Sequence, residues 1–133
     1  MIRSISTITL KNRSLTESTR SQEEVPPLRT LTHAQLKPAI DYVHTHLHED
    51  LSLVQIAKVI NISPTYFASL FKCTMGISPH QYVIKQRVYG AKLLLLTTDL
   101  PIADIAFQVG FSSQSHLNQQ FKRFTGMTPK QVR

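Results

Sequence analysis

Cysteine occurs once in the 133-residue sequence, and its scarcity excludes two kinds of small protein. A lone Cys73 supports neither a disulfide framework nor a cysteine-ligated zinc site. Glycine occurs four times, and no G-x-S-x-G elbow of the kind that exposes a hydrolase nucleophile is present. We therefore expect no enzyme activity, no cofactor and no metal site, and a single thiol fits a reducing cytoplasm.

Long hydrophobic runs are also missing. The longest, Leu93–Leu96, is far shorter than the roughly 20 residues that a membrane-spanning helix needs. The N-terminus has no apolar block followed by a small-residue cleavage site, so export is not expected. These absences predict a cytoplasmic protein without membrane contact.

Acidic residues are few, with 8 Asp and Glu against 15 Lys and Arg, which gives a net charge of +7. From Leu51 onward the only acids are Asp99 and Asp104, so the basic excess lies in this part of the chain. A sign asymmetry of this kind favours a polyanionic partner.

The first 36 residues are rich in Ser, Thr, Arg and Glu and contain the pair Pro26-Pro27. This composition is typical of a linker or a poorly ordered tail. Beyond it, apolar residues recur at helical spacing, and the predicted fold is all-α. The first helix is expected at Pro38–Leu47, because proline is tolerated in a first helical turn.

Serines mark the next helix starts. Ser52 stands three residues before Gln55, a capping-box spacing that begins a helix ending near Asn61. Ser63-Pro64 and Ser78-Pro79 begin the third and fourth helices. The fourth is predicted to run to about Leu96 and is long enough to join two halves, with these residues facing inward: Tyr82, Val83, Val88, Ala91, Leu94 and Leu95.

The sequence then repeats itself. Ile56-Ala57 returns 49 residues later as Ile105-Ala106, and after one inserted residue the offset becomes 50, so that Phe71-Lys72 returns as Phe121-Lys122. The other matches are Leu53 with Ile102, Ile60 with Val109, Ile62-Ser63 with Phe111-Ser112, Gly76 with Gly126, Ser78-Pro79 with Thr128-Pro129, and Gln81 with Gln131. So many matches at a nearly constant offset predict an internal duplication.

Each copy has a short helix, a tight turn and a second amphipathic helix, which is the helix-turn-helix pattern. Asn61 and Gly110 occupy the two turns, and both residue types tolerate a left-handed backbone. In this motif the second helix enters the major groove of DNA. The outward positions should then carry hydrogen-bonding groups, and both copies have them, though unequally. The second copy has Ser113, Gln114, Ser115, His116, Asn118 and Gln119, whereas the corresponding stretch of the first copy is smaller and less polar: Pro64, Thr65, Tyr66, Ala68, Ser69 and Lys72.

These motifs closely resemble the DNA-binding domain of the AraC/XylS family of bacterial transcriptional regulators. The first set runs from Leu51-Ser52-Leu53 to Gly76 and Pro79, through Ser63-Pro64-Thr65-Tyr66-Phe67. The second, which matches the signature region of the family, includes Ile102-Ala103-Asp104-Ile105-Ala106, Val109-Gly110-Phe111, Phe121-Lys122, Gly126 and Thr128-Pro129. The resemblance covers roughly residues 37–133.

The resemblance implies a seven-helix domain at 37–133, with helix-turn-helix subdomains at 37–77 and 99–133 and a linker helix at 79–96 that presents both recognition helices to one face of DNA. It implies a sequence-specific activator that contacts double-stranded promoter DNA and RNA polymerase. Family members usually carry an N-terminal ligand-binding or dimerisation domain, so the chain is either a stand-alone regulator or lacks that partner. The base-reading positions carried over are Thr65, Ala68, Ser69, Gln114, Ser115 and Gln119.

Further residues are expected to contact the DNA backbone or to support the reading helices: Ser63, Tyr66, Lys72, Lys85, Arg87, Lys92, Ser113, His116, Asn118, Lys122 and Arg123. Basic side chains among them would hold phosphates. Cys73, next to packed aromatic residues, is expected to be buried and inert.

Three other interpretations account for part of the sequence. A helical protein-interaction module with a basic face would share the charge and the helices. His44 and His48 have a spacing that can hold zinc, but no third ligand is evident. The six phenylalanines could stack on single-stranded bases, although core packing explains most of them better. They are Phe67, Phe71, Phe107, Phe111, Phe121 and Phe124.

Overall fold

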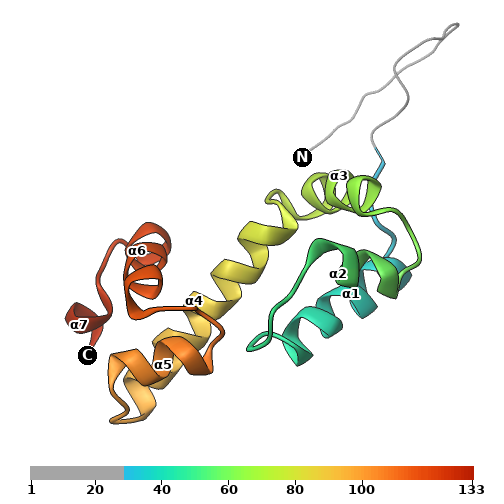
Figure 1. Ribbon diagram of the computed structural model, residues 1–133. Coiled ribbons are helices and arrows are strands. Elements are labelled where there is room, and N and C mark those ends of the chain that lie inside the picture. Colours follow the sequence, from blue (N-terminus) through green and yellow to red (C-terminus); the bar gives the residue numbers. More distant parts are fainter. Residues whose placement is uncertain (1–28) are drawn as a thin grey trace, which may run out of the picture.

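The computed structural model describes residues 29–133, and this part of the chain contains helices and no strand, which confirms the all-α prediction. Figure 1 shows the long helix α4 running between two groups, α1–α3 at one end and α5–α7 at the other. Within these residues, no helix combines the length and the apolarity needed to cross a membrane. The helices are α1 (His33–Thr45), α2 (Leu53–Val59), α3 (Pro64–Met75), α4 (Pro79–Thr97), α5 (Ile102–Gln108), α6 (Gln114–Thr125) and α7 (Pro129–Val132).

Helix α1 begins earlier than the sequence suggested. The Thr32 hydroxyl accepts the Gln35 N–H at 3.2 Å, and the Gln35 side-chain oxygen accepts the Thr32 N–H at 3.0 Å, which completes a capping box. Pro38 therefore lies inside α1, and the predicted start at Pro38 was wrong. The proline lacks an N–H, so it leaves one carbonyl of the preceding turn without an intrahelical donor.

The end of the predicted linker packs against the folded domain. Leu31 is only 6% exposed, and its N–H donates to the Thr74 hydroxyl of α3 at 2.8 Å. Residues 31–36 thus belong to the first half of the domain, although the sequence assigned them to the tail. The rest of that tail, residues 1–28, lies outside the described residues.

The other predicted helix starts are confirmed. Ser52, Ser63 and Ser78 are the N-caps of α2, α3 and α4, and each side chain accepts a backbone N–H from the first turn of its helix. Gly76 ends α3 in the left-handed conformation with φ 82°, as expected for a C-terminal glycine. Local capping chemistry therefore determines where most of the helices begin and end.

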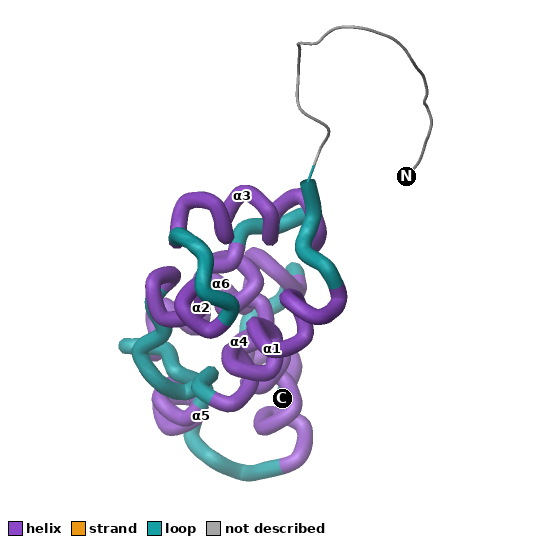
Figure 2. Tube along the Cα trace, turned by 90° about the vertical axis from the view of Figure 1, so that its right-hand side faces the viewer, coloured by secondary structure: helices purple, strands orange, loops and turns teal. Residues whose placement is uncertain are grey.

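Two separate hydrophobic clusters of side chains hold the molecule together. They belong to the two groups of helices that lie toward opposite ends of α4 in Figure 1 and overlap in the turned view of Figure 2. The first includes Phe67 and Phe71 of α3, which pack against the start of α4, and the second includes Leu117 and Phe121 of α6, which pack against the rest of α4. Both clusters share one continuous helix, so α4 determines how the two halves are oriented. The inward residues predicted on α4 are buried, except Leu94, which is partly buried.

The turns within the two helix pairs both use a left-handed residue, as predicted. Asn61 has φ 58° in the first turn, and Gly110 has φ 101° in the second. At Gly110 a Cβ atom would lie 2.6 Å from the Leu47 carbonyl oxygen and 2.7 Å from the Arg87 Nε. Glycine is therefore required at this position by close packing as well as by backbone conformation.

The inserted residue of the second copy lies in its turn. The N-cap of α6 is Ser113, whose hydroxyl accepts the His116 N–H at 3.1 Å. Ser113 therefore takes the structural place of Ser63, whereas the sequence comparison had matched Ser63 with Ser112. From the N-cap onward the recognition helices correspond at an offset of 50 residues.

Two arginine side chains form hydrogen bonds with the loops that precede α2 and α5. Arg87 of α4 donates from Nε to the Leu47 carbonyl at 2.9 Å and from Nη2 to the Glu49 carbonyl at 2.7 Å. Arg133 plays the same part in the second half, where it donates to the carbonyl oxygens of Leu95, Thr98 and Leu100. Both side chains satisfy carbonyls at or just beyond a helix C-terminus, where intrahelical donors run out.

Candidate nucleic-acid interface

Helix α6 buries one face and presents the other to solvent. Leu117 and Phe121 are fully buried against α4, and they orient the helix. The opposite face is exposed and entirely polar in its first two turns, where it carries Gln114, Ser115, Asn118 and Gln119. The sequence predicted this exposure, and the amides on this face can form paired hydrogen bonds with base edges.

Helix α3 is arranged in the same way but is less polar. Phe67, Leu70 and Phe71 form its buried face, while Thr65, Tyr66 and Ser69 are exposed. Ala68 is half-buried and lines a cleft between the two halves, so it does not lie on the fully exposed face. The structure thus groups Thr65 and Ser69 on one surface and places Ala68 at its edge.

Three of the predicted supporting residues act within the protein. The Ser63 and Ser113 hydroxyls cap the two recognition helices by accepting the N–H groups of Tyr66 and His116. The His116 ring is half-buried and packs edge-on against Phe111, with 5.1 Å between ring centroids. These contacts hold α3 and α6 in position, which agrees with a supporting role.

The basic residues differ in how free their charges are. Lys72, Lys92, Lys122 and Arg123 are exposed, and Lys85 lies half-buried with its ammonium 5.7 Å from the Tyr89 ring centroid. Arg87 is different, because two of its nitrogens are bound to backbone carbonyls. Arg87 thus supports the loop between α1 and α2, through long-range contacts that the sequence does not reveal.

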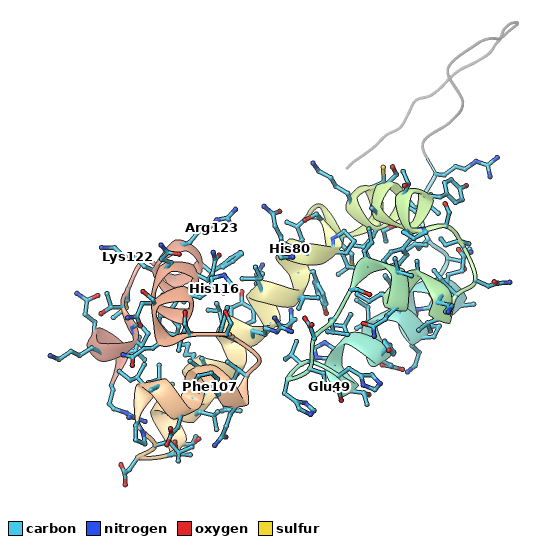
Figure 3. The ribbon with its side chains drawn as sticks, in the orientation of Figure 1. Glu49, His80, Phe107, His116, Lys122 and Arg123 are labelled. Carbon is cyan, nitrogen blue, oxygen red and sulfur yellow. The ribbon has the colours of Figure 1, made fainter. Side chains whose placement is uncertain are left out.

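Charge is segregated within the described residues. Helices α3, α4 and α6 contain no Asp or Glu, and the acids of residues 29–133 lie in α1, α5 and the loops before α2 and α5. Figure 3 shows Lys122 and Arg123 on one side of the molecule, and Glu49 on the other. The side that carries the two exposed polar helices is therefore also the basic side, as phosphate binding requires.

The three clustered histidines have other partners. His44 is hydrogen-bonded to the Tyr82 hydroxyl at 3.1 Å, and burial raises the pKa of Tyr82 above its usual value. His46 and His48 lie near the Glu49 carboxylate, at 3.1 and 3.7 Å. No group of three metal-binding side chains forms among residues 29–133.

One expectation about packed side chains is confirmed and another fails. Core packing accounts for most of the phenylalanines, since Phe67, Phe71, Phe111 and Phe121 are buried and Phe124 packs against the second cluster, whereas Phe107 is 62% exposed on α5. Cys73, expected to be buried, is exposed on α3. It lies two residues from Phe71, and this spacing points it away from the buried face of the helix.

Comparisons with known proteins agree with this arrangement. Residues 56–133 match a family model described as a helix-turn-helix domain. The DNA-binding domain of AdpA, solved in complex with a target DNA, is 31% identical, with a TM-score of 0.69 over 73% of this chain and 87% of that one. The chain belongs to the AraC family of DNA-binding domains.

Other known proteins are similarly close. The C-terminal domain of the response regulator yesN from Fusobacterium nucleatum has a TM-score of 0.71 and 31% identity, over 75% of this chain and 98% of that one. The probable transcriptional regulator LumQ from Photobacterium leiognathi is 39% identical over 67% of this chain. The chain spans 36% or less of the length of the curated relatives it matches.

Proposed function

We propose that this AraC-type domain reads a specific double-stranded sequence by inserting α3 and α6 into successive major grooves. The observation that carries the proposal is the pair of exposed polar helices, free of acidic residues, at the two ends of α4. Two reading helices in one chain do what a two-fold dimer does in other regulators, in which the half-sites lie about 34–36 Å apart. A monomer can then bind specifically.

Base reading is assigned mainly to α6. Gln114 and Gln119 are long, exposed amides, and such side chains discriminate adenine through two hydrogen bonds. In α3, Thr65 and Ser69 offer shorter hydroxyls, and Ala68 offers a methyl group that suits contact with thymine. Lys72, Lys122 and Arg123 hold the phosphates, with Lys85 and Lys92 as further candidates on α4.

The test begins with selection of bound duplexes from a random pool. Gln114→Ala is expected to weaken binding to the selected site by about 1–3 kcal/mol and to relax the preference at one base pair. Gln108→Ala is the matched control, because Gln108 is exposed at the end of α5, outside both reading helices. An unchanged preference in the Gln114 variant would remove Gln114 as a base-reading residue, and a pool without enrichment would favour a protein-interaction module instead.

We assign to the same domain an activating role through contact with RNA polymerase. Apolar side chains remain exposed on α4 and α5, namely Tyr89, Leu93, Leu96 and Phe107, and they suit a protein partner. Leu93→Ser is expected to lower transcription from a promoter carrying the selected site while leaving DNA affinity unchanged. The same proposal includes an N-terminal effector or dimerisation domain as a possible partner. It also places the regulator at the nucleoid, in the cytoplasm.

A further inference from the structure

A cleft of about 350 Å³ lies between the two halves of the molecule, alongside α4. Its volume falls within the range of about 300–1,000 Å³ that is typical of small-molecule sites, which often lie where two packed units meet. Most of its lining is apolar and comes from the first half and from α4, and His116 of α6 closes it from the second half. The apolar lining residues are Leu51, Leu53, Ile56, Ala68, Pro79, Val83 and Ile84. Neither base reading nor phosphate binding explains an apolar hollow of this size.

The polar groups around the cleft are mostly basic. Arg87, His80 and His116 line it, and Asp50 is the only acid among the lining residues. The hydrogen bonds that Arg87 makes to residues 29–133 use Nε and Nη2, and none uses Nη1. Burial lowers the pKa of Arg87, partly offset by the nearby Asp50, so its charge is incompletely solvated. A guanidinium in this state gains from a further anionic partner.

We propose that the cleft binds a small carboxylic acid with an apolar body, such as an aromatic acid. The apolar body would pack on Leu51, Ile56 and Val83, and the carboxylate would be attracted by Arg87 and the two histidines. Because Asp50 offsets part of the positive charge, the cleft suits a single negative charge better than two. Figure 3 shows His80 and His116 on neighbouring helices, on the side that carries Lys122 and Arg123.

Ligand binding at this position would act on DNA binding, an effect that rests on the proposed function. The cleft is lined by Ala68 of α3 and His116 of α6, so it touches both reading helices. A carboxylate held there adds negative charge between them and repels the DNA backbone. The acid is therefore expected to weaken DNA binding, and DNA to weaken binding of the acid by the same factor.

The binding test uses the 133-residue chain without DNA, with 2-naphthoate as the probe and its uncharged analogue 2-naphthamide as the comparison. Saturable binding of naphthoate, about tenfold tighter than that of naphthamide, is expected from one charge-assisted contact. In wild-type protein, naphthoate should shift the methyl resonances of Ile56, Val83 and Ile84 and leave those of Leu93 and Leu96 unchanged. This mapping needs no variant.

Two neighbouring substitutions locate the site. Leu53→Glu places a carboxylate at the cleft and is expected to weaken naphthoate binding about tenfold. Val54→Glu makes the same change of charge one residue away, at a side chain that is 56% exposed and outside the cleft lining, and should have little effect. Circular dichroism checks that both variants remain folded.

Each outcome decides one part of the inference. Absence of saturable binding, or shifts outside the cleft, overturns the site, and equal affinity for the amide overturns the anionic class. A final titration measures the affinity for the selected duplex with and without saturating naphthoate, and a weaker affinity in wild type but not in Leu53→Glu supports the regulatory effect. Because the first measurements contain no DNA, failure of the ligand site and failure of DNA recognition are separately visible.

Discussion

The two halves of the domain share a scaffold and differ at the surface that faces the proposed DNA. Aligned on their N-caps, the recognition helices place Asn118 where the first half has Ala68, and Gln119 where it has Ser69. Arg123 likewise stands opposite Cys73. Amides and a guanidinium in α6 thus replace a methyl, a hydroxyl and a thiol in α3. The comparison teaches that the duplicated framework was kept while hydrogen-bonding capacity became concentrated in the second half.

Beneath this surface the halves remain alike. Ile56 and Ala57 of α2 and the equivalent residues of α5, Ile105 and Ala106, are all buried at 3% exposure or less. Each half also has its own fastening arginine, although Arg87 and Arg133 do not correspond in the repeat. Conserving the inner face keeps the angle between the paired helices, so the outer face is free to vary without changing how the helix is presented.

The largest expected effect compares the two cores. Phe71→Ala and Phe121→Ala each remove an aromatic ring that is 1% exposed or less and should cost about 3–5 kcal/mol of unfolding free energy. The loss for Phe71→Ala should lie toward the upper end of this range. The centroid of the Phe71 ring is 5.5 Å from those of Phe67 and Tyr82, and such aromatic pairs add about 0.5–1.5 kcal/mol. Urea unfolding measures both; a loss below 1 kcal/mol in either would show that its half is not packed as described.

A smaller difference is expected between two glycines of the second half. Gly126 has φ 79° with open space around its Cβ position, so Gly126→Ala should cost only the backbone strain, about 1–2 kcal/mol. Gly110→Ala also drives a methyl group into the Leu47 carbonyl and the Arg87 side chain, which adds about 1–3 kcal/mol. Thermal unfolding of the two variants tests this order. Equal losses would indicate that the junction between the halves yields easily.

The sequence predicted the parts of the fold that depend on local chemistry. Ser52, Ser63 and Ser78 begin helices because their hydroxyls accept first-turn N–H groups, and this signal needs only a few neighbouring residues. The start of α1 was misplaced because Pro38 gave a stronger local signal than the capping box at Thr32. Pro38 lies six residues after Thr32, the true N-cap. In this helix the proline therefore does not mark the start, because a better cap precedes it.

The parts that the sequence did not reveal depend on contacts between distant residues. The charge of Arg87 predicts a DNA-backbone or supporting role, but it does not reveal that the hydrogen bonds of Arg87 reach residues 40 and 38 positions away. The cleft between the halves likewise exists only once α4 has set their orientation. Cys73 was mispredicted for a different reason: its proximity to packed Phe71 in the chain suggests burial, whereas helical periodicity turns it outward.

The smallest expected effect concerns phosphate binding. It tests whether α3 can be given the phosphate contact that Arg123 is proposed to make on α6. Cys73→Arg restores at α3 the charge that Arg123 supplies at α6, and Cys73 is exposed, so the fold should tolerate the change. If this side chain reaches a phosphate, the slope of log affinity against log salt should steepen by about 0.9, and Arg123→Ser should flatten it by about the same amount. Cys73→Ser controls for loss of the thiol and should leave the slope unchanged.

Fluorescence anisotropy on the selected duplex at several salt concentrations gives the three slopes. A flattened slope for Arg123→Ser beside an unchanged slope for Cys73→Arg would mean that only the end of α6 approaches the backbone, and that the two reading helices do not dock in the same way.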